Sequence, residues 1–104
     1  MTNDETIARA FKSLAHPRRV KIFRILATNP ETGRSFTTLH NAMNIGETPL
    51  VHHLREMERG GLITRKRRGA EVVHVLTTDL LFLAMDETKR LGRKATGPAP
   101  RRAA

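Results

Sequence analysis

The hydrophobic pattern at the start of the chain predicts a helix from about Asp4 to Leu14. Its apolar residues recur at intervals of three and four, which is typical of one buried helical face: Ile7, Ala10, Phe11 and Leu14. His16-Pro17 should end this helix, because the residue before a proline avoids the helical region. Pro17 then suits the first position of a second helix, which we expect to run to about Ala27.

The second helix is predicted to be the central one. Its apolar side chains cover most of the circumference: Val20, Ile22, Phe23, Ile25 and Leu26. A helix that is apolar on most sides is buried against several neighbours. The basic side chains of this segment should remain on its outside: Arg18, Arg19, Lys21 and Arg24.

Two shorter helices are predicted next, on either side of a tight turn over Asn44 to Glu47. Thr37 is a suitable N-cap for the first, whose apolar residues are Leu39, Ala42 and Met43. Thr48 is expected to cap the second, with Pro49 in its first turn, and Gly60-Gly61 to end it. Its apolar residues share one face: Leu50, Leu54 and Met57. Two short helices around a glycine-containing turn are typical of a helix-turn-helix.

After Gly61 the spacing of the apolar residues changes to the alternation that is typical of β-strands. Two strands are expected, over about Leu62–Arg67 and Glu71–Leu76, joined by a turn around Arg68-Gly69-Ala70. Thr77 to Asp79 should cap a last helix that runs to about Leu91. Residues 92–104 are rich in Gly, Pro, Ala and Arg, and we expect a basic, disordered tail after a single domain over residues 1–91.

The fold class expected from these elements is mainly α with a small β-hairpin: a winged helix-turn-helix with five helices and a two-stranded wing. The formal net charge of +9 over 104 residues favours a polyanionic partner, and nucleic acid is the leading candidate. Solubility alone, or a place in a ribonucleoprotein, would also account for the charge.

The chain contains no cysteine, which excludes disulfides and thiolate metal sites and fits a cytoplasmic setting. It has no run of about twenty apolar residues for a membrane span, and its N-terminus is unlike a signal peptide. Trp and Tyr are absent, which weakens the hypothesis that the protein binds single strands or RNA by stacking bases on aromatic side chains.

Two segments resemble the ArsR-type bacterial transcriptional regulators. LAHPRRVKIFRIL, residues 14–26, is similar to the opening of their second helix, and VHHLREMERGGLI, residues 51–63, to the end of their recognition helix and the entry to the wing. The resemblance covers about residues 6–91. It implies a winged-helix homodimer in which the first and last helices form the dimer contact and two recognition helices enter successive major grooves of an imperfect palindrome. It also implies repression that an inducer releases.

Members of this family that sense metals use cysteines in the third helix, or Asp, His and Glu on the last helix. Here Ser35 to Met43 contains no cysteine, and the last helix offers Asp79, Asp86 and Glu87 but no histidine. We therefore predict neither a metal site nor a cofactor. The inducer, whether a small molecule or a protein, is not identified by the sequence.

The helix after the turn is predicted to present two faces. His53 lies beside Leu50, Leu54 and Met57 and should pack at the edge of the core, where it forms local hydrogen bonds. His52 points away, so the adjacent histidines should not chelate one ion. The opposite face is the candidate DNA-reading surface, against the alternative of a solvated polar face: Thr48, Pro49, Val51, His52 and Arg55.

Further candidate contacts are basic or hydroxylic. The wing tip should touch phosphates through Arg65, Lys66, Arg67 and Arg68. Other candidate phosphate contacts are Arg18, Arg19, Lys21, Thr37 and Thr38. The alternative for the three basic residues is that they only solvate the helix surface. A two-fold dimer interface is expected to contain Ile7, Phe11, Leu80, Leu83, Ala84 and Leu91, because one small core cannot cover every apolar face of the terminal helices. The basic C-terminal arm would add DNA affinity or serve solubility.

These features favour a sequence-specific double-stranded-DNA-binding regulator, a dimeric repressor of a promoter. The alternatives are a basic winged-helix RNA-binding or ribonucleoprotein component, and a regulator switched by a protein partner. Catalysis is not expected. Glu56 and Glu58 are flanked by arginines on a helix surface, no Ser or Thr has a convincing His and acid partner, and no Gly-rich loop follows a strand.

Overall fold

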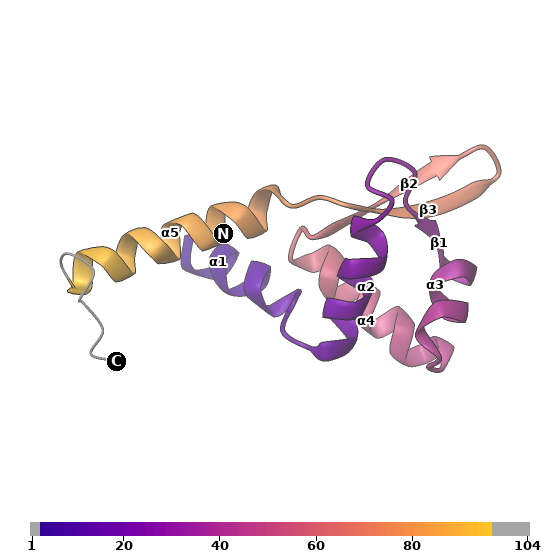
Figure 1. The fold of residues 1–104 in the computed structure, drawn as a ribbon, viewed down its shortest axis with the longest axis horizontal. Coiled ribbons are helices and arrows are strands. Elements are labelled where there is room, and N and C mark those ends of the chain that lie inside the picture. The colour runs from indigo at the N-terminus through magenta and orange to yellow at the C-terminus, as the bar shows by residue number, and fades with distance from the viewer. Residues whose placement is uncertain (1–2, 97–104) are drawn as a thin grey trace.

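The computed structural model describes residues 3–96 as helices and strands wrapped around one core (Figure 1). The elements in chain order are α1 (Asn3–Lys12), α2 (Pro17–Ala27), β1 (Arg34–Ser35), α3 (Phe36–Met43), α4 (Glu47–Arg59), β2 (Ile63–Arg68), β3 (Glu71–Leu76) and α5 (Asp79–Thr96). The expected winged helix-turn-helix, five helices and a two-stranded wing, is confirmed. No helix in this part of the chain is long and apolar enough to cross a membrane.

The bounds of α2 are those that the sequence predicts, and the His16-Pro17 pair explains them. Pro17 occupies the start of the helix, where its missing N–H removes no hydrogen bond. His16 is the N-cap: its Nδ1 accepts a hydrogen bond from the backbone N–H of Arg18 at 3.1 Å. The preceding helix ends at Lys12, earlier than expected.

The caps of α3 and α4 differ from the prediction. Ser35, and not Thr37, is the N-cap of α3, and its hydroxyl accepts from the backbone N–H of Thr38 at 3.1 Å. Serine is the stronger N-cap residue, and here it stands directly before Phe36 in extended backbone. Gly46, and not Thr48, precedes α4, so Thr48 lies within the first helical turn. Pro49 fits there because the N–H groups of the first turn have no partner inside the helix.

The end of α4 at Gly60-Gly61 is confirmed. Gly61 has a φ of +72°, its N–H donates to the carbonyl of Glu58, and the N–H of Leu62 donates to the carbonyl of Met57. This pair of bonds is the Schellman motif, which requires a left-handed residue and so favours glycine. A Cβ at Gly60 would lie 2.4 Å from Cβ of Ser13 and 2.5 Å from the carbonyl oxygen of Arg9. The end of α4 therefore touches the last turn of α1.

The wing is part of a three-stranded antiparallel sheet with the order β1-β3-β2. Its hairpin turns at Gly69, with a φ of +62°, between Arg68 and its cross-strand partner Glu71. The short strand β1 was not predicted, because two residues cannot show a period of two. It is placed by the approach of Gly33 to β3, where a Cβ would lie 2.4 Å from the carbonyl oxygen of His74.

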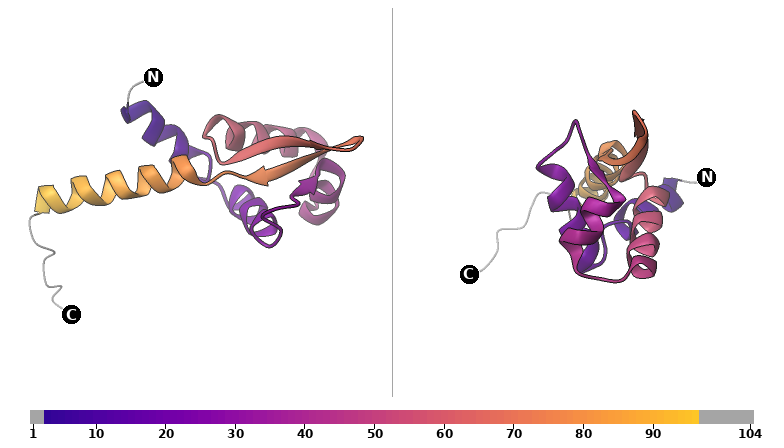
Figure 2. Two further views of the ribbon diagram at one scale, coloured as in Figure 1. Left: turned by 90° about the horizontal axis from the view of Figure 1, so that it is seen from above. Right: turned by 90° about the vertical axis from the view of Figure 1, so that its right-hand side faces the viewer.

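The core lies between α2, α3, α4 and the base of the wing. Its fully buried side chains include Ile22, Leu26, Leu39, Leu50, Met57 and Leu62. Ala42, expected on the core face of α3, is exposed, since that short helix buries only Leu39 and Met43. Figure 2 shows α5 at one end of the molecule, with α1 beside its first turns, and the tip of the hairpin at the other end.

The last helix is longer than expected. Residues 92–96, predicted as the start of a disordered tail, belong to α5, because nothing in this segment before Gly97 breaks a helix except Gly92, which is exposed and tolerated. The rest of that predicted tail, residues 97–104, lies outside the described residues.

Candidate nucleic-acid interface

The outward face of α4 carries the side chains that the sequence assigns to DNA reading. Thr48, Pro49, His52 and Arg55 are exposed, and Val51 is half-buried. The opposite face of the helix enters the core through Leu50, Leu54 and Met57. The side chain of Arg55 forms no hydrogen bond or ion pair within residues 3–96, so its guanidinium is available to a ligand.

His53 packs at the edge of the core, as expected, and is only 4% exposed. Its Nδ1 accepts a hydrogen bond from Nε of Arg19 at 3.1 Å, and its ring centroid lies 4.5 Å from that of His16. Burial, followed by the electrostatic effect of His16 and Arg19, lowers the pKa of His53 from 6.5 to about 4. The imidazole is therefore neutral at pH 7.

The prediction that Arg19 lies on the outside of α2 is wrong. Its side chain is buried, with 6% exposed, because the end of α1 and the helix α4 cover that side of α2. Besides its bond to His53, its Nη1 donates to the carbonyl oxygen of Lys12 at 2.7 Å. A buried guanidinium cannot reach a phosphate, so Arg19 leaves the set of candidate phosphate contacts. Arg18 and Lys21 are exposed.

Glu56 is a second buried polar residue that sequence reasoning placed on the surface. Its carboxylate pairs with Nη1 of Arg59 at 2.7 Å and with Nζ of Lys12 at 3.6 Å. Burial acts to raise the pKa of Glu56, but Lys12 and Arg59 outweigh it and lower that pKa below its usual value. The only sequence signal for the Glu56–Arg59 pair was a basic residue three positions after the glutamate. This spacing is also common on exposed helices.

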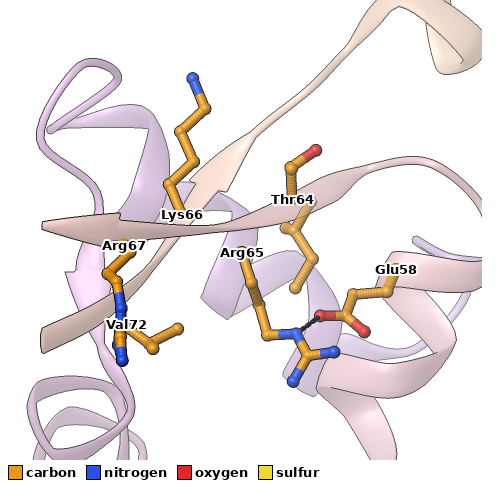
Figure 3. Close-up of a pocket in the computed structure, with 7 residues that line it drawn as sticks. Glu58, Thr64, Arg65, Lys66, Arg67 and Val72 are labelled. Carbon is orange, nitrogen blue, oxygen red and sulfur yellow. Dashed lines mark ion pairs between the residues drawn. The ribbon is translucent and has the colours of Figure 1, made fainter.

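The basic residues of the wing divide into two groups. Arg65 is paired through its Nε with Oε1 of Glu58 at 2.7 Å, and Arg68 donates to the carbonyl oxygen of Glu31 in the loop after α2. The side chains of Lys66 and Arg67 form no hydrogen bond or ion pair in the described part of the chain. Figure 3 shows Arg65 and Arg67 on the side of β2 that faces α4, and Lys66 on the other side.

Two adjoining hollows separate α4 from the wing. One, of about 410 Å³, is lined by Phe36, Val51, Leu54, Arg55, Glu58, Arg65, Val72 and His74. The other, of about 560 Å³, is lined by Glu58, Ile63, Thr64, Arg65, Lys66, Arg67 and Val72 (Figure 3). We refer to both together as the α4–wing groove. Burial lowers the pKa of His74, so the groove wall contributed by that ring is neutral at pH 7.

Thr37 and Thr38, at the start of α3, are both exposed. The hydroxyl of Thr38 accepts from that of Ser35 at 3.0 Å, which leaves Thr37 as the freer of the two.

The terminal helices expose a cluster of large apolar side chains. Leu83 is 63% exposed, and Phe11, Leu80 and Leu91 are exposed as well, whereas Ile7 is half-buried. Ala84 does not belong with them: it is 2% exposed within a single chain, and it is buried in α5 together with Leu81. Phe82 and Met85 are exposed apolar residues on α5 that our list of interface residues left out.

No group of three or more His, Asp and Glu side chains within residues 3–96 is arranged to hold a metal ion. His16 caps α2, and the ring of His40 stacks on that of Phe36 with centroids 5.9 Å apart.

The low pKa of His53 predicts that the protein loses stability in mild acid. The folded state resists protonation of this ring, whereas the unfolded chain takes up the proton near pH 6.5, so the free energy of unfolding should fall as the pH drops from 6.5 towards 4. The full loss attributable to His53 is about 3 kcal/mol. Urea unfolding of the wild type and of His53→Gln, which keeps an acceptor for Arg19, measures the effect. The variant should lose less stability over this interval, and equal losses would contradict the assignment.

Three comparisons with known proteins bear on this arrangement. The sequence pattern of the family described as "Helix-turn-helix domain" matches residues 14–66, which run from the turn before α2 into β2. No curated protein matches the sequence. Solved structures match the fold over most of the chain.

An ArsR-like transcriptional regulator from Rhodococcus sp. RHA1 superimposes with a TM-score of 0.73, at 17% identity, over 89% of this chain and 85% of that one. The homodimeric winged helix-turn-helix DNA-binding domain Mb0332 of Mycobacterium bovis has a TM-score of 0.65, at 21% identity, over 94% of this chain and 89% of that one. HlyU from Vibrio cholerae has a TM-score of 0.59, at 22% identity, over 88% of this chain and 97% of that one. The chain thus belongs to the helix-turn-helix domain family, and its fold is the winged helix-turn-helix of ArsR-family transcriptional regulators.

Proposed function

We propose that this protein is a sequence-specific double-stranded-DNA-binding transcription regulator that acts as a dimeric repressor by occluding a promoter. The observation that carries the proposal is the exposed, unpaired face of α4 in a helix-turn-helix, flanked by the free cations Lys66 and Arg67 of the wing. A helix in this setting enters the major groove, where base pairs present distinct patterns of donors and acceptors.

The first half of α4 reads bases. Arg55 can donate two hydrogen bonds to O6 and N7 of guanine, His52 can donate to guanine or a phosphate, and Val51 can contact a thymine methyl. Thr48 and Pro49, in the first turn, lie closest to the end that enters the groove.

Phosphate contacts surround this reading surface. Lys66 and Arg67 serve from the wing, Thr37 and Thr38 from the start of α3, and Arg18 and Lys21 from the start of α2. Phosphate contacts position the protein and supply the salt-dependent part of the affinity. Arg68 is engaged with the Glu31 carbonyl and holds the loop to the wing in place.

Dimerisation through α1 and α5 brings two reading helices onto one duplex. The exposed apolar side chains on these helices support a two-fold contact formed by Phe11, Leu80, Leu83 and Leu91, with Ile7 at its edge. One structural neighbour is a homodimeric DNA-binding domain. Two reading helices about 34 Å apart match one turn of DNA, so the operator is an imperfect inverted repeat. The repressor responds to an inducer, a small molecule or a protein.

Selection of bound sequences from random duplex DNA tests the proposal. A palindromic motif should be enriched. Arg55→Ala should lose about 1–3 kcal/mol on the preferred sequence and relax one position per half-site. Arg67→Ala should weaken all duplexes alike and lower the salt slope by about one.

Enrichment without a palindrome, together with tighter binding of structured RNA, would favour the RNA-binding alternative. The deep major groove of A-form RNA does not admit a helix, so Arg55→Ala should then leave affinity unchanged.

A further inference from the structure

The α4–wing groove contains one acidic side chain among several basic ones. Glu58 lines both of its hollows, and the other charged residues around them are Arg55, Arg65, Lys66 and Arg67. A surface that takes up a sugar–phosphate strand gains nothing directly from a carboxylate, because the carboxylate repels the phosphates. The presence of Glu58 in this groove therefore needs a physical explanation.

The partner of Glu58 supplies this reason. Its Oε1 lies 2.7 Å from Nε of Arg65, and the side chain of Glu58 is 28% exposed, compared with 65% for Arg65 (Figure 3). Arg65 pairs across the strands with His74, and its side chain lies on the α4 side of β2 together with that of Arg67. Without Glu58, Arg65 would be a third free cation of the wing beside Lys66 and Arg67.

We propose that Glu58 is an intramolecular substitute for a DNA phosphate. It occupies Arg65, keeps that side chain out of the set of phosphate contacts, and so limits sequence-independent binding to any duplex. This role rests on the proposed function. In this role Glu58 is a positioning residue that acts on DNA binding through Arg65. The wing cations then have two functions: Arg65 docks the wing onto α4, whereas Lys66 and Arg67 bind DNA.

Counterion release makes this role of Glu58 measurable. Each phosphate that a cation neutralises adds about 0.9 to the slope of log affinity against log salt concentration. A cation already neutralised by a carboxylate on its own chain releases no counterion from the duplex. Arg65 should therefore contribute nothing to the measured slope while Glu58 is present. Once Glu58 is replaced, Arg65 should contribute to the slope like any other phosphate contact.

The test uses the full chain and a mixed-sequence duplex of about 30 base pairs, roughly three helical turns, titrated over a range of salt concentrations. Glu58→Gln should bind about five- to tenfold more tightly near 0.1 M salt, with a slope steeper by about one. Adding Arg65→Ala to Glu58→Gln should remove both gains. Arg65→Ala alone should leave the slope unchanged, whereas Arg67→Ala should lower it by about one.

The chain offers a matched control in Glu87→Gln. Glu87 pairs with Arg90 at 2.6 Å, with side chains 27% and 60% exposed, so this substitution changes the net charge and frees an arginine in the same way, but on α5. Glu87 lies one helical turn from both Leu83 and Leu91, so sedimentation equilibrium first shows that Glu87→Gln associates like the wild type. Its slope should then remain within experimental error of the wild type. Circular dichroism at increasing urea concentration shows that each variant is folded, as expected when an exposed ion pair is lost.

The role of Glu58 would be overturned by weaker binding of Glu58→Gln, by a gain that persists without Arg65, or by a slope that Arg65→Ala lowers as much as Arg67→Ala does. Equal gains in Glu58→Gln and Glu87→Gln would reduce the effect to net charge and would also overturn it. If the wild type binds no duplex at any salt concentration, the proposed function itself fails, which is a different outcome from duplex binding with unchanged slopes.

Discussion

Replacing Leu83 by lysine is expected to produce a folded monomer that has lost at least about a hundredfold of the affinity for a duplex carrying both half-sites. Leu83 is the most exposed of the large apolar residues, so its replacement removes little from the core of a single chain. At a two-fold interface the two introduced ammonium groups would lie near each other and oppose association. Without association, one reading helix binds alone.

The design separates association from charge. An added lysine by itself would strengthen binding to DNA, so a loss of affinity reports the lost dimer. Asp86→Asn is the matched control: it changes the net charge by the same amount at an exposed position on the same helix. Sedimentation equilibrium measures the mass, and fluorescence anisotropy measures binding to one and to two half-sites. A dimeric Leu83→Lys protein, or a monomer with undiminished affinity for the full site, would contradict the interface proposed on α1 and α5.

Arg19→Ala should destabilise the fold by about 3 kcal/mol, whereas Arg18→Ala should change it by less than about 0.5 kcal/mol. The two residues are adjacent arginines with opposite surroundings: Arg18 is exposed, and Arg19 is buried between Nδ1 of His53 and the carbonyl oxygen of Lys12. Truncating Arg19 removes the donor to Nδ1 of His53 and one of the two donors to the Lys12 carbonyl, which still accepts from the N–H of Ala15, and it opens a cavity between α1, α2 and α4. Urea unfolding at pH 7 gives both free energies.

A second readout distinguishes this contact from a general loss of packing. The charge of Arg19 is one of the causes that lower the pKa of His53, so removing it should raise that pKa towards 6.5. An NMR titration of the His53 ring in Arg19→Ala follows this shift, with Arg18→Ala as the comparison. Equal destabilisation by the two variants, with the His53 pKa unmoved in both, would show that Arg19 does not connect the helices in the way described.

Much of the fold is local information and could be predicted. His16-Pro17 sets the start of α2, Gly60-Gly61 sets the end of α4, and the alternation after them sets the hairpin. Each of these signals acts within one turn or one strand pair, where backbone conformation and side-chain period are readable from neighbouring residues. The caps Ser35 and Gly46 were missed by a residue or two, the usual uncertainty of helix ends.

The errors concern charged residues whose surroundings come from distant parts of the chain. Arg19 belongs by period to the polar side of α2, yet two other helices cover it. Glu56 looks exposed beside Arg59, yet Lys12 approaches it from α1. By sequence Ala84 was predicted as an interface residue, but the single chain already buries it. The spacing of apolar residues describes one helix by itself and does not show which other helix packs against each of its faces.

The sequence by itself determined the order of helices and strands, the helix-turn-helix with its basic wing, and the exposed face of α4 from Thr48 to Arg55, because these depend on short-range period, caps and turns. Only the tertiary structure decided which cations are free. Arg65 and Arg68 have the same side chain as Arg67 and lie within two residues of it. Glu58 engages Arg65 and the carbonyl of Glu31 engages Arg68, which leaves Arg67 open. Charge is a property of the residue, whereas its availability to a phosphate depends on partners that only the folded chain brings within hydrogen-bonding distance.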